Sequence, residues 1–231
     1  MTDARLDLIR ELEHADEEVA AVLAELDELY AATEAVRERA LDLEGFFARV
    51  PAALAAAAEA VEKAERDVVT AEEAAERAAA DLRAAEGAGD AERLAAARRF
   101  DVRARDSLAV ARRRHDEALA ERERLDAEAA EAERERPELV ARAGGLATAL
   151  RERQRLAADA GAEPGASLED VSAWAAGARA ALLVARSSLA AERDAVIRQA
   201  NELGSLVLGE PLAPGATSAV ARRVERALRD G

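Results

Sequence analysis

The sequence predicts an all-α protein: a long antiparallel coiled-coil hairpin projecting from a three-helix bundle base, plus a short C-terminal helix. Three observations support this. Ala, Glu, Arg and Leu dominate the 231 residues, apolar residues recur with heptad spacing, and Gly87 and Gly89 interrupt the helical pattern where the hairpin is expected to turn. Enrichment in these four residue types with heptad spacing is typical of coiled coils and long helices.

The composition limits both the core and the chemistry. Aromatic residues are 2% and charged residues 35% of the chain, which favours a thin core coated with charge over a compact sphere. The absence of cysteine excludes a disulfide scaffold, thiolate zinc sites and a cysteine nucleophile. A net charge of −15 makes the chain as a whole repel nucleic acid and anionic lipid.

The sequence gives no sign of membrane insertion or export. There is no uncharged apolar run of the roughly 18 residues that a transmembrane helix requires. The segment Met1–Arg5 is acidic and amphipathic and lacks the charged-then-apolar layout of a signal peptide. We therefore expect a cytoplasmic protein.

The first helix is predicted to begin near Thr2 or Asp3, either of which can cap it. Two sets of apolar residues alternate at spacings of three and four, and they form the seam that faces partner helices. They are Leu12, Val19, Leu26, Thr33, Ala40 and Phe47, and Leu8, Ala15, Val22, Leu29, Val36, Leu43 and Val50. Ile9, Leu23 and Tyr30 widen this stripe, as expected for a helix that contacts two partners.

A run of roughly nine acids without Arg or Lys lies between Glu11 and Glu34. We interpret it as a solvated helix face, with a docking face for a basic partner as the alternative. Further on, Pro51 removes a helical hydrogen bond, but the heptad continues from Phe47 through Leu54, so we expect a kink rather than a reversal.

Beyond Pro51 the second set of seam residues is alanine only, which predicts a narrow two-stranded arm. The hairpin turns at 87–90, where Gly87 is expected to take the left-handed conformation and Asp90 to cap the returning helix. The arm from Ala52 to Glu86 is acidic, whereas the arm from Arg93 to Arg124 is basic, which favours cross-helix ion pairs.

The predicted segments are a hairpin over 1–160, a loop over 161–166, a third long helix over 167–208, a linker over 209–216 and a terminal helix over 217–231. The returning helix is expected to run past Pro137, and the sequence leaves open whether Pro137 and Gly144-Gly145 mark kinks or a break. The third helix begins with a capping box between Ser167 and Asp170. The base is expected to contain the first helix up to Val50 and the returning helix beyond about Leu125.

The third helix has a regular heptad, which predicts two sets of buried positions. They are Leu168, Ala175, Leu182, Leu189, Val196 and Leu203, and Val171, Ala178, Ala185, Glu192, Gln199 and Leu206.

Few residues are candidates for a site. Arg112, Arg113 and Arg114 could bind phosphate groups, but the acidic facing arm and the lack of an interleaved aromatic residue favour pairing within the chain. Trp174 is interpreted as a core anchor, with a partner-binding residue as the alternative. Gly87 and Gly89 follow a helix rather than a strand, which argues against nucleotide binding.

No catalytic, cofactor-binding or metal-binding constellation is found. His14 and His115 lack the spacing of metal ligands, and His115 is interpreted as a residue at the core edge. Asp101 and Arg122 occupy seam positions and are interpreted as markers of helix register.

The leading functional hypothesis is a non-enzymatic scaffold that acts through protein contacts or self-association. One alternative is a coiled-coil accessory of chromosome or DNA-repair machinery. The other is a peripheral membrane-remodelling hairpin, whose form is loosely similar to phage-shock and ESCRT-III-type proteins. The net charge disfavours both nucleic-acid and membrane partners.

Overall fold

The computed structural model describes residues 2–88, 90–153, 163–213 and 215–230. The regular structure in these ranges is entirely helical and comprises α1 (Thr2–Ala88), α2 (Ala91–Glu152), α3 (Leu168–Leu208) and α4 (Thr217–Asp230). The predicted all-α class is confirmed.

Two of the helices are much longer than is usual. α1 continues through Pro51, and α2 continues through both Pro137 and the pair Gly144-Gly145. A proline costs a helix about 3 kcal/mol, because it lacks an N–H and crowds the preceding turn. Packing of apolar side chains on both sides of Pro51, including Val50 and Ala57, outweighs this cost.

The chain divides into two compact units, which we describe separately. The bundle unit contains Met1–Asp42 and Pro137–Gly231, and the hairpin unit contains Leu43–Arg136. The bundle unit was expected to include Val50 and to resume near Leu125, so it is shorter on both helices.

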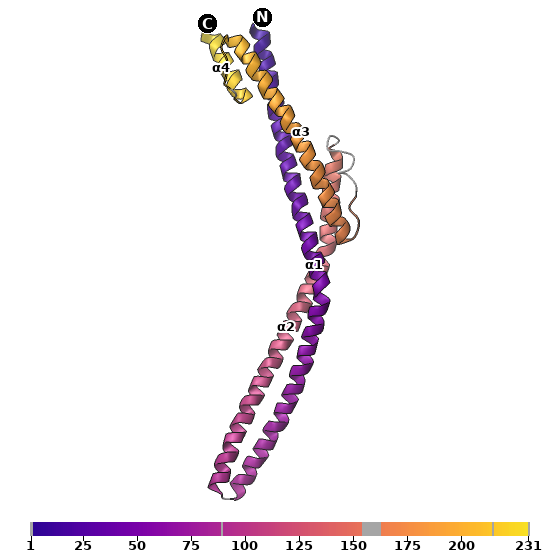
Figure 1. Ribbon diagram of the computed structural model, residues 1–231, viewed down its shortest axis with the longest axis vertical. Coiled ribbons are helices and arrows are strands. Elements are labelled where there is room, and N and C mark those ends of the chain that lie inside the picture. Colours follow the sequence, from indigo (N-terminus) through magenta and orange to yellow (C-terminus); the bar gives the residue numbers. More distant parts are fainter. Residues whose placement is uncertain (1, 89, 154–162, 214, 231) are drawn as a thin grey trace. The chain divides into compact units, whose positions relative to one another are not determined.

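In the hairpin unit, α1 and α2 run antiparallel (Figure 1). Apart from Leu43, their buried apolar side chains are small: Val50, Ala57, Val61, Ala64, Ala78 and Ala85 on α1, and Ala104, Ala111 and Ala132 on α2. The four buried alanines of α1 belong to the predicted alanine seam, whose other member, Ala71, is half-buried. An alanine seam buries little apolar area per residue. Each methylene that alanine lacks relative to leucine forgoes about 0.8 kcal/mol of stabilisation, so packing stabilises this unit less than a leucine seam would.

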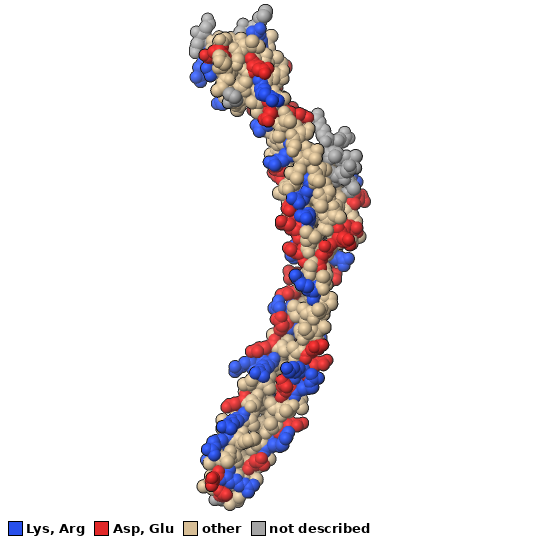
Figure 2. Space-filling model, in the orientation of Figure 1, with Lys and Arg blue, Asp and Glu red and all other residues tan. Residues whose placement is uncertain are grey.

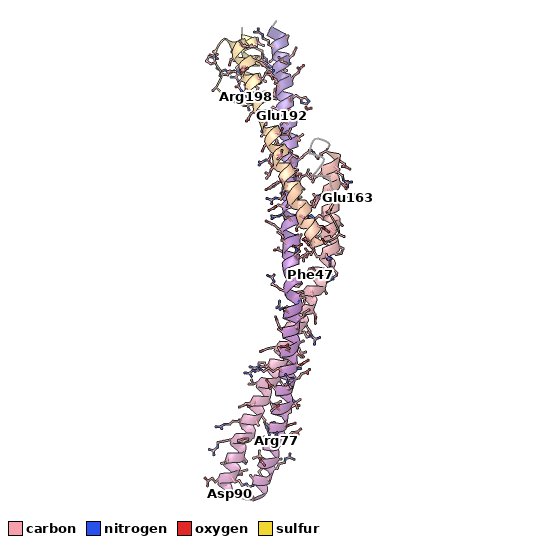
Figure 3. All side chains as sticks on the ribbon, turned by 45° about the vertical axis from the view of Figure 1, so that its right-hand side comes forward. Phe47, Arg77, Asp90, Glu163, Glu192 and Arg198 are labelled. Carbon is pink, nitrogen blue, oxygen red and sulfur yellow. The ribbon has the colours of Figure 1, made fainter. Side chains whose placement is uncertain are left out.

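The turn of the hairpin differs from the prediction at one residue. Gly87 lies inside α1, which ends one residue later, and within the described residues Gly209 is the glycine with positive φ. A glycine near an exposed helix end costs only about 1 kcal/mol, which an additional helical residue can offset. Asp90 caps α2 as predicted, since its carboxylate accepts hydrogen bonds from the amides of Glu92 at 3.0 Å and Arg93 at 3.1 Å (Figure 3). Gly89 lies outside the described residues.

One seam position of the hairpin holds a charge. Asp101 is 5% exposed and pairs with Arg105 through one oxygen at 2.9 Å, while its Oδ1 is buried without a hydrogen-bond partner in the described structure. A buried carboxylate that is only half satisfied carries a desolvation cost. Asp101 therefore opposes the stability of the hairpin.

We expect Asp101→Leu to raise the free energy of unfolding by about 1–2 kcal/mol, because leucine has the same branching and removes the unpaired oxygen. Guanidinium unfolding followed by circular dichroism at 222 nm measures the change. The control is Asp106→Leu, at an exposed position of the same helix, which should change stability by less than about 0.5 kcal/mol. Equal effects at both positions would contradict this account.

The bundle unit has two apolar clusters along α3. The first joins α1, α2 and α3 through Leu26, Leu150, Ala178 and Leu182, with Trp174 packed against it. The second joins α1, α3 and α4, and its members are Ile9, Val220, Ala221 and Val224, with Leu6, Leu203, Val207, Leu208, Leu212 and Leu228 around them.

The heptad predicted for α3 fails in its second half. Glu192, which Figure 3 labels, is exposed, as are Gln199 and Leu206. Ala200 and Gly204 are buried. An α-helix has 3.6 residues per turn, so a seven-residue repeat drifts by about 20° per heptad unless the helix supercoils. Over the length of α3 this drift shifts the buried positions by one residue relative to the heptad. In the second half of α3, α4 replaces α2 as the neighbouring helix.

The start of α1 shows a similar shift. Ile9 is fully buried, whereas the predicted seam residues Leu8 and Val22 are 38% and 37% exposed. Ile9 contacts the cluster formed with α4, which is distant in sequence. The capping box that opens α3 is present as predicted, with the Asp170 amide donating to Ser167 Oγ at 3.0 Å.

Candidate interaction surfaces

The arginine triplet lies in the hairpin unit, where each of its members is exposed. Arg112 donates to Glu72 of α1 at 2.8 Å, which is the cross-helix pairing expected from the opposite charges of the two arms. Arg113 and Arg114 form no ion pair within 4 Å with the acids in the described ranges. Pairing within the hairpin therefore accounts for one arginine of the three. Figure 2 shows basic and acidic side chains interspersed along this unit.

One side of the hairpin combines apolar and basic side chains; we name it the Phe100 side. It contains Phe100, Arg103, Ser107, Val110 and Arg114, which are spaced as residues on one face of a helix. The side chains of Phe100 and Val110 are 67% and 46% exposed. An aromatic residue therefore does follow directly on Arg98 and Arg99, which corrects the expectation that none is interleaved in this basic segment.

A hollow of about 640 Å³ lies on the Phe100 side, between α1 and α2. Small side chains form its floor, and its lining is Asp67, Thr70, Ala71, Ala74, Asp106, Ser107, Val110, Ala111 and Arg114. The hollow arises because alanine and serine leave space beside the seam that larger residues would fill. Charged groups of both signs at its edge suit contact with an amphipathic helix better than contact with a uniformly charged ligand.

Trp174 lies in the bundle unit, half-buried against the cluster of Leu26, Leu150 and Leu182. Its Nε1 is buried without a hydrogen-bond partner in the described structure. Nearby, Arg179 donates to the Tyr30 hydroxyl at 2.7 Å, stacks 5.1 Å from its ring centroid and pairs with Glu34. These contacts place Trp174 within the packing of three helices of the bundle unit.

The bundle unit also contains a buried polar cluster that the sequence did not reveal. Asp16 is 6% exposed, and its two oxygens accept from Arg193 Nε of α3 and Thr217 Oγ1 of α4, each at 2.6 Å. Burial, the largest effect, raises the pKa of Asp16, but the hydrogen bonds from Thr217 and Arg193 and the charge of Arg193 together bring it below its ordinary value. This cluster fixes α4 to α1 and α3.

The contacts of Asp16 predict a pH dependence. A carboxylate with a lowered folded pKa stabilises the fold above its unfolded pKa, near 3.9, and this stabilisation is lost as the pH falls through the folded value. We expect protection of the α4 amides from hydrogen exchange to fall on acidification below about pH 4, after correction for the intrinsic rate. In the Asp16→Asn variant this acid-induced loss of α4 protection should be absent. If the variant loses protection with the same pH dependence, the loss comes from other carboxylates.

The acidic run of α1 is only partly a solvated face. Asp16 is buried, Glu34 is half-buried and pairs with Arg179 at 2.5 Å, and Asp27 pairs with Arg186 at 2.9 Å. Arginines of α3 thus neutralise part of the run, and the expectation of a fully solvated face was wrong at Asp16 and Glu34.

The two histidines belong to different units. His14 of the bundle unit is exposed beside Glu18 at 3.2 Å, and His115 of the hairpin unit is half-buried, 3.8 Å from Glu65. The described residues contain no group of three or more His, Cys, Asp or Glu side chains arranged to hold a metal ion. Among the described helices, none has the length and apolarity required to cross a bilayer.

These surfaces can make ion pairs and apolar contacts with another macromolecule. Comparison with protein-family models, with curated proteins and with solved structures found no match for this chain.

Proposed function

We propose that this protein is a non-enzymatic scaffold that binds other protein chains along its hairpin unit. The observation that carries the proposal is the exposure of large apolar side chains on a two-helix element, above all Val110, which lines the hollow, and Phe100 on the same side of the hairpin. Exposed apolar groups rimmed by charge are typical of protein interaction sites.

The chemistry of the Phe100 side indicates the kind of partner. Burial of an exposed phenylalanine or valine contributes about 1.5–3 kcal/mol, so two such residues support a weak and reversible contact. A helix laid along the hollow would cover Phe100 and Val110 and present its own charges to Asp67 and Arg114.

Site-specific photo-crosslinking of the full chain tests the proposal. A photo-reactive amino acid at Phe100 or Val110 should give crosslinked adducts with another protein in the cells that express the chain. The matched control is Ala120, an exposed position on the same helix away from the hollow. Adduct yields that are no higher at Phe100 and Val110 than at Ala120 would refute the proposal.

A second candidate function, contact with nucleic acid, is supported by one observation. Arg98, Arg99 and Arg103 form no ion pair within 4 Å with acids in the described ranges, and Phe100 could stack on a base. If the chain contacts nucleic acid, its DNA binding should weaken steeply with salt and should be lost when Arg98, Arg99 and Arg103 are changed to Glu. Absence of binding at low salt would eliminate it.

A further inference from the structure

The side of the hairpin opposite Phe100 carries two parallel stripes of opposite charge; we name it the Glu72 side. On α1 the stripe is Glu65, Val69, Glu72 and Glu76, and on α2 it is Arg98, Val102, Arg105 and Arg112. Within each stripe the spacing of three, four or seven residues keeps the side chains on one helix face. The 2.8 Å ion pair between Arg112 and Glu72 fixes both stripes to the same side of the hairpin.

Each stripe has an exposed apolar residue between its charges. Val69 is 55% exposed within the acidic stripe, and Val102 is 57% exposed within the basic stripe. The charged groups stay accessible as well, since the side chains of Glu72 and Arg112 are 43% and 60% exposed despite their pairing. The Glu72 side thus resembles half of a four-helix interface, with apolar residues flanked by charge.

The division of charge selects both the occupant and its orientation. If the two-fold axis is parallel to the long axis of the hairpin, α1 of one copy lies over α2 of the other, and its acids face arginines. If the axis is perpendicular to the long axis, in the plane of the two helices, α1 lies over α1 and acids face acids. We propose that a second copy of this chain docks on the Glu72 side with the two hairpin turns pointing in the same direction.

The two stripes extend about 20 Å along the hairpin, so a strip about 13 Å wide buries about 260 Å² per partner. This is below the roughly 800 Å² per partner of a stable interface, so we expect the dimer to be weak and to form only at high concentration. The net charge of −15 opposes the approach of two copies at long range. At about 0.15 M salt the Debye length is near 8 Å, which screens that repulsion while leaving pairs in contact effective.

Sedimentation of the full chain across a concentration series at about 0.15 M salt measures this association. We expect a monomer–dimer equilibrium that Val102→Glu weakens at least about tenfold, because it adds an acid opposite the acidic stripe of the other copy. The matched control is Val110→Glu on the Phe100 side, which should leave the equilibrium unchanged. A wild-type chain that stays monomeric at high micromolar concentration, or equal effects of both variants, would overturn the proposal.

Charge reversal adds a rescue test. One variant changes Glu65, Glu72 and Glu76 to Arg, and a second changes Arg98, Arg105 and Arg112 to Glu. Each should sediment as a monomer alone, and a mixture of the two should form a heterodimer. Helicity by circular dichroism verifies that both variants are folded; two folded variants that fail to associate when mixed would contradict the charge argument.

The orientation can be tested by spin labels, because the chain has no native cysteine. Glu59→Cys and Ala80→Cys occupy equivalent exposed heptad positions on α1, 21 residues or about 31 Å apart. An axis along the hairpin gives the same label-to-label distance at both positions. Clearly unequal distances would show the opposite orientation.

This inference deepens the proposed scaffold function by naming one partner, and the two can fail separately. Loss of self-association leaves adducts with other proteins at Phe100 intact. Conversely, dimers formed through the Glu72 side would persist if Phe100 gave no adducts.

Discussion

Gly204→Leu is expected to release α4 from the bundle unit and to lower its stability by about 3–5 kcal/mol. A Cβ atom at position 204 would lie 2.6 Å from Val220 Cγ1 and 2.7 Å from Leu212 Cδ1, closer than nonbonded carbon atoms approach. The longer leucine side chain cannot fit unless the two elements separate. Separation removes the burial of Ile9, Val220 and Val224, at about 1.5–3 kcal/mol each, less what these residues recover by local collapse.

Hydrogen exchange of the α4 amides and thermal unfolding measure this effect. The control is Gly177→Ala in the same helix, where an added Cβ meets nothing within 4 Å. That substitution should raise stability by about 0.5–1 kcal/mol, because alanine is the better helix former. Full protection of α4 in Gly204→Leu would mean that the contact of α3 with α4 is not a close steric fit.

Leu182→Ala is expected to lower the free energy of unfolding by about 2–5 kcal/mol. Leu182 is 2% exposed in the cluster that joins α1, α2 and α3, so truncation leaves a cavity among three helices. The neighbouring residue supplies a matched control, since Leu183 is 45% exposed and its change to alanine should cost less than about 1 kcal/mol. Denaturant unfolding followed by Trp174 fluorescence reports on this cluster.

Similar costs at positions 182 and 183 would contradict the assignment of the buried face of α3. They would support instead a loosely packed unit in which neither leucine is fixed against a partner.

Most of the helical architecture depends on patterns within a few turns of one helix, and these patterns can be recognised in the sequence. The caps at Asp90 and Ser167 and the alanine seam depend on residues within one or two turns, and each was predicted. Apolar spacing on both sides of Pro137 favoured a helix that runs past it, but left open whether the proline marks a kink or a break; α2 is continuous through it.

The failures have a common physical origin in contacts between distant segments. The buried line on α3 leaves the heptad at Glu192 because α4 becomes the neighbour and a straight helix drifts relative to a seven-residue repeat. The sequence predicts Asp16 to be one acid in a solvated run. Its partners Arg193 and Thr217 lie 177 and 201 residues away, so their contact with Asp16 could not be predicted. No local pattern distinguishes Asp16 from the exposed acids beside it.

The candidate surfaces were only partly predictable for a similar reason. The opposite charges of the two arms predicted cross-helix pairing, and the pair of Arg112 and Glu72 matches it. The sequence did not show which apolar residues stay exposed, because that depends on the hairpin register. Phe100 follows two arginines directly and could have been noticed from its position alone.

The span of the contacts in sequence has a consequence for the order of folding. Arg112 and Glu72 are 40 residues apart, whereas Thr217 and Asp16 are 201 apart and Arg10 and Glu225 are 215 apart. Contacts near the turn close short loops and form early, whereas the contacts with α4 must wait until residues 217–230 are made. At about 5–20 residues per second, Asp16 and Ile9 await α4 for roughly 10–40 s during synthesis. Throughout that interval, Ile9 and Asp16 of α1 lack the α4 residues that cover them in the folded unit. An apolar and acidic helix face left uncovered in this way is the kind of surface that holding chaperones bind.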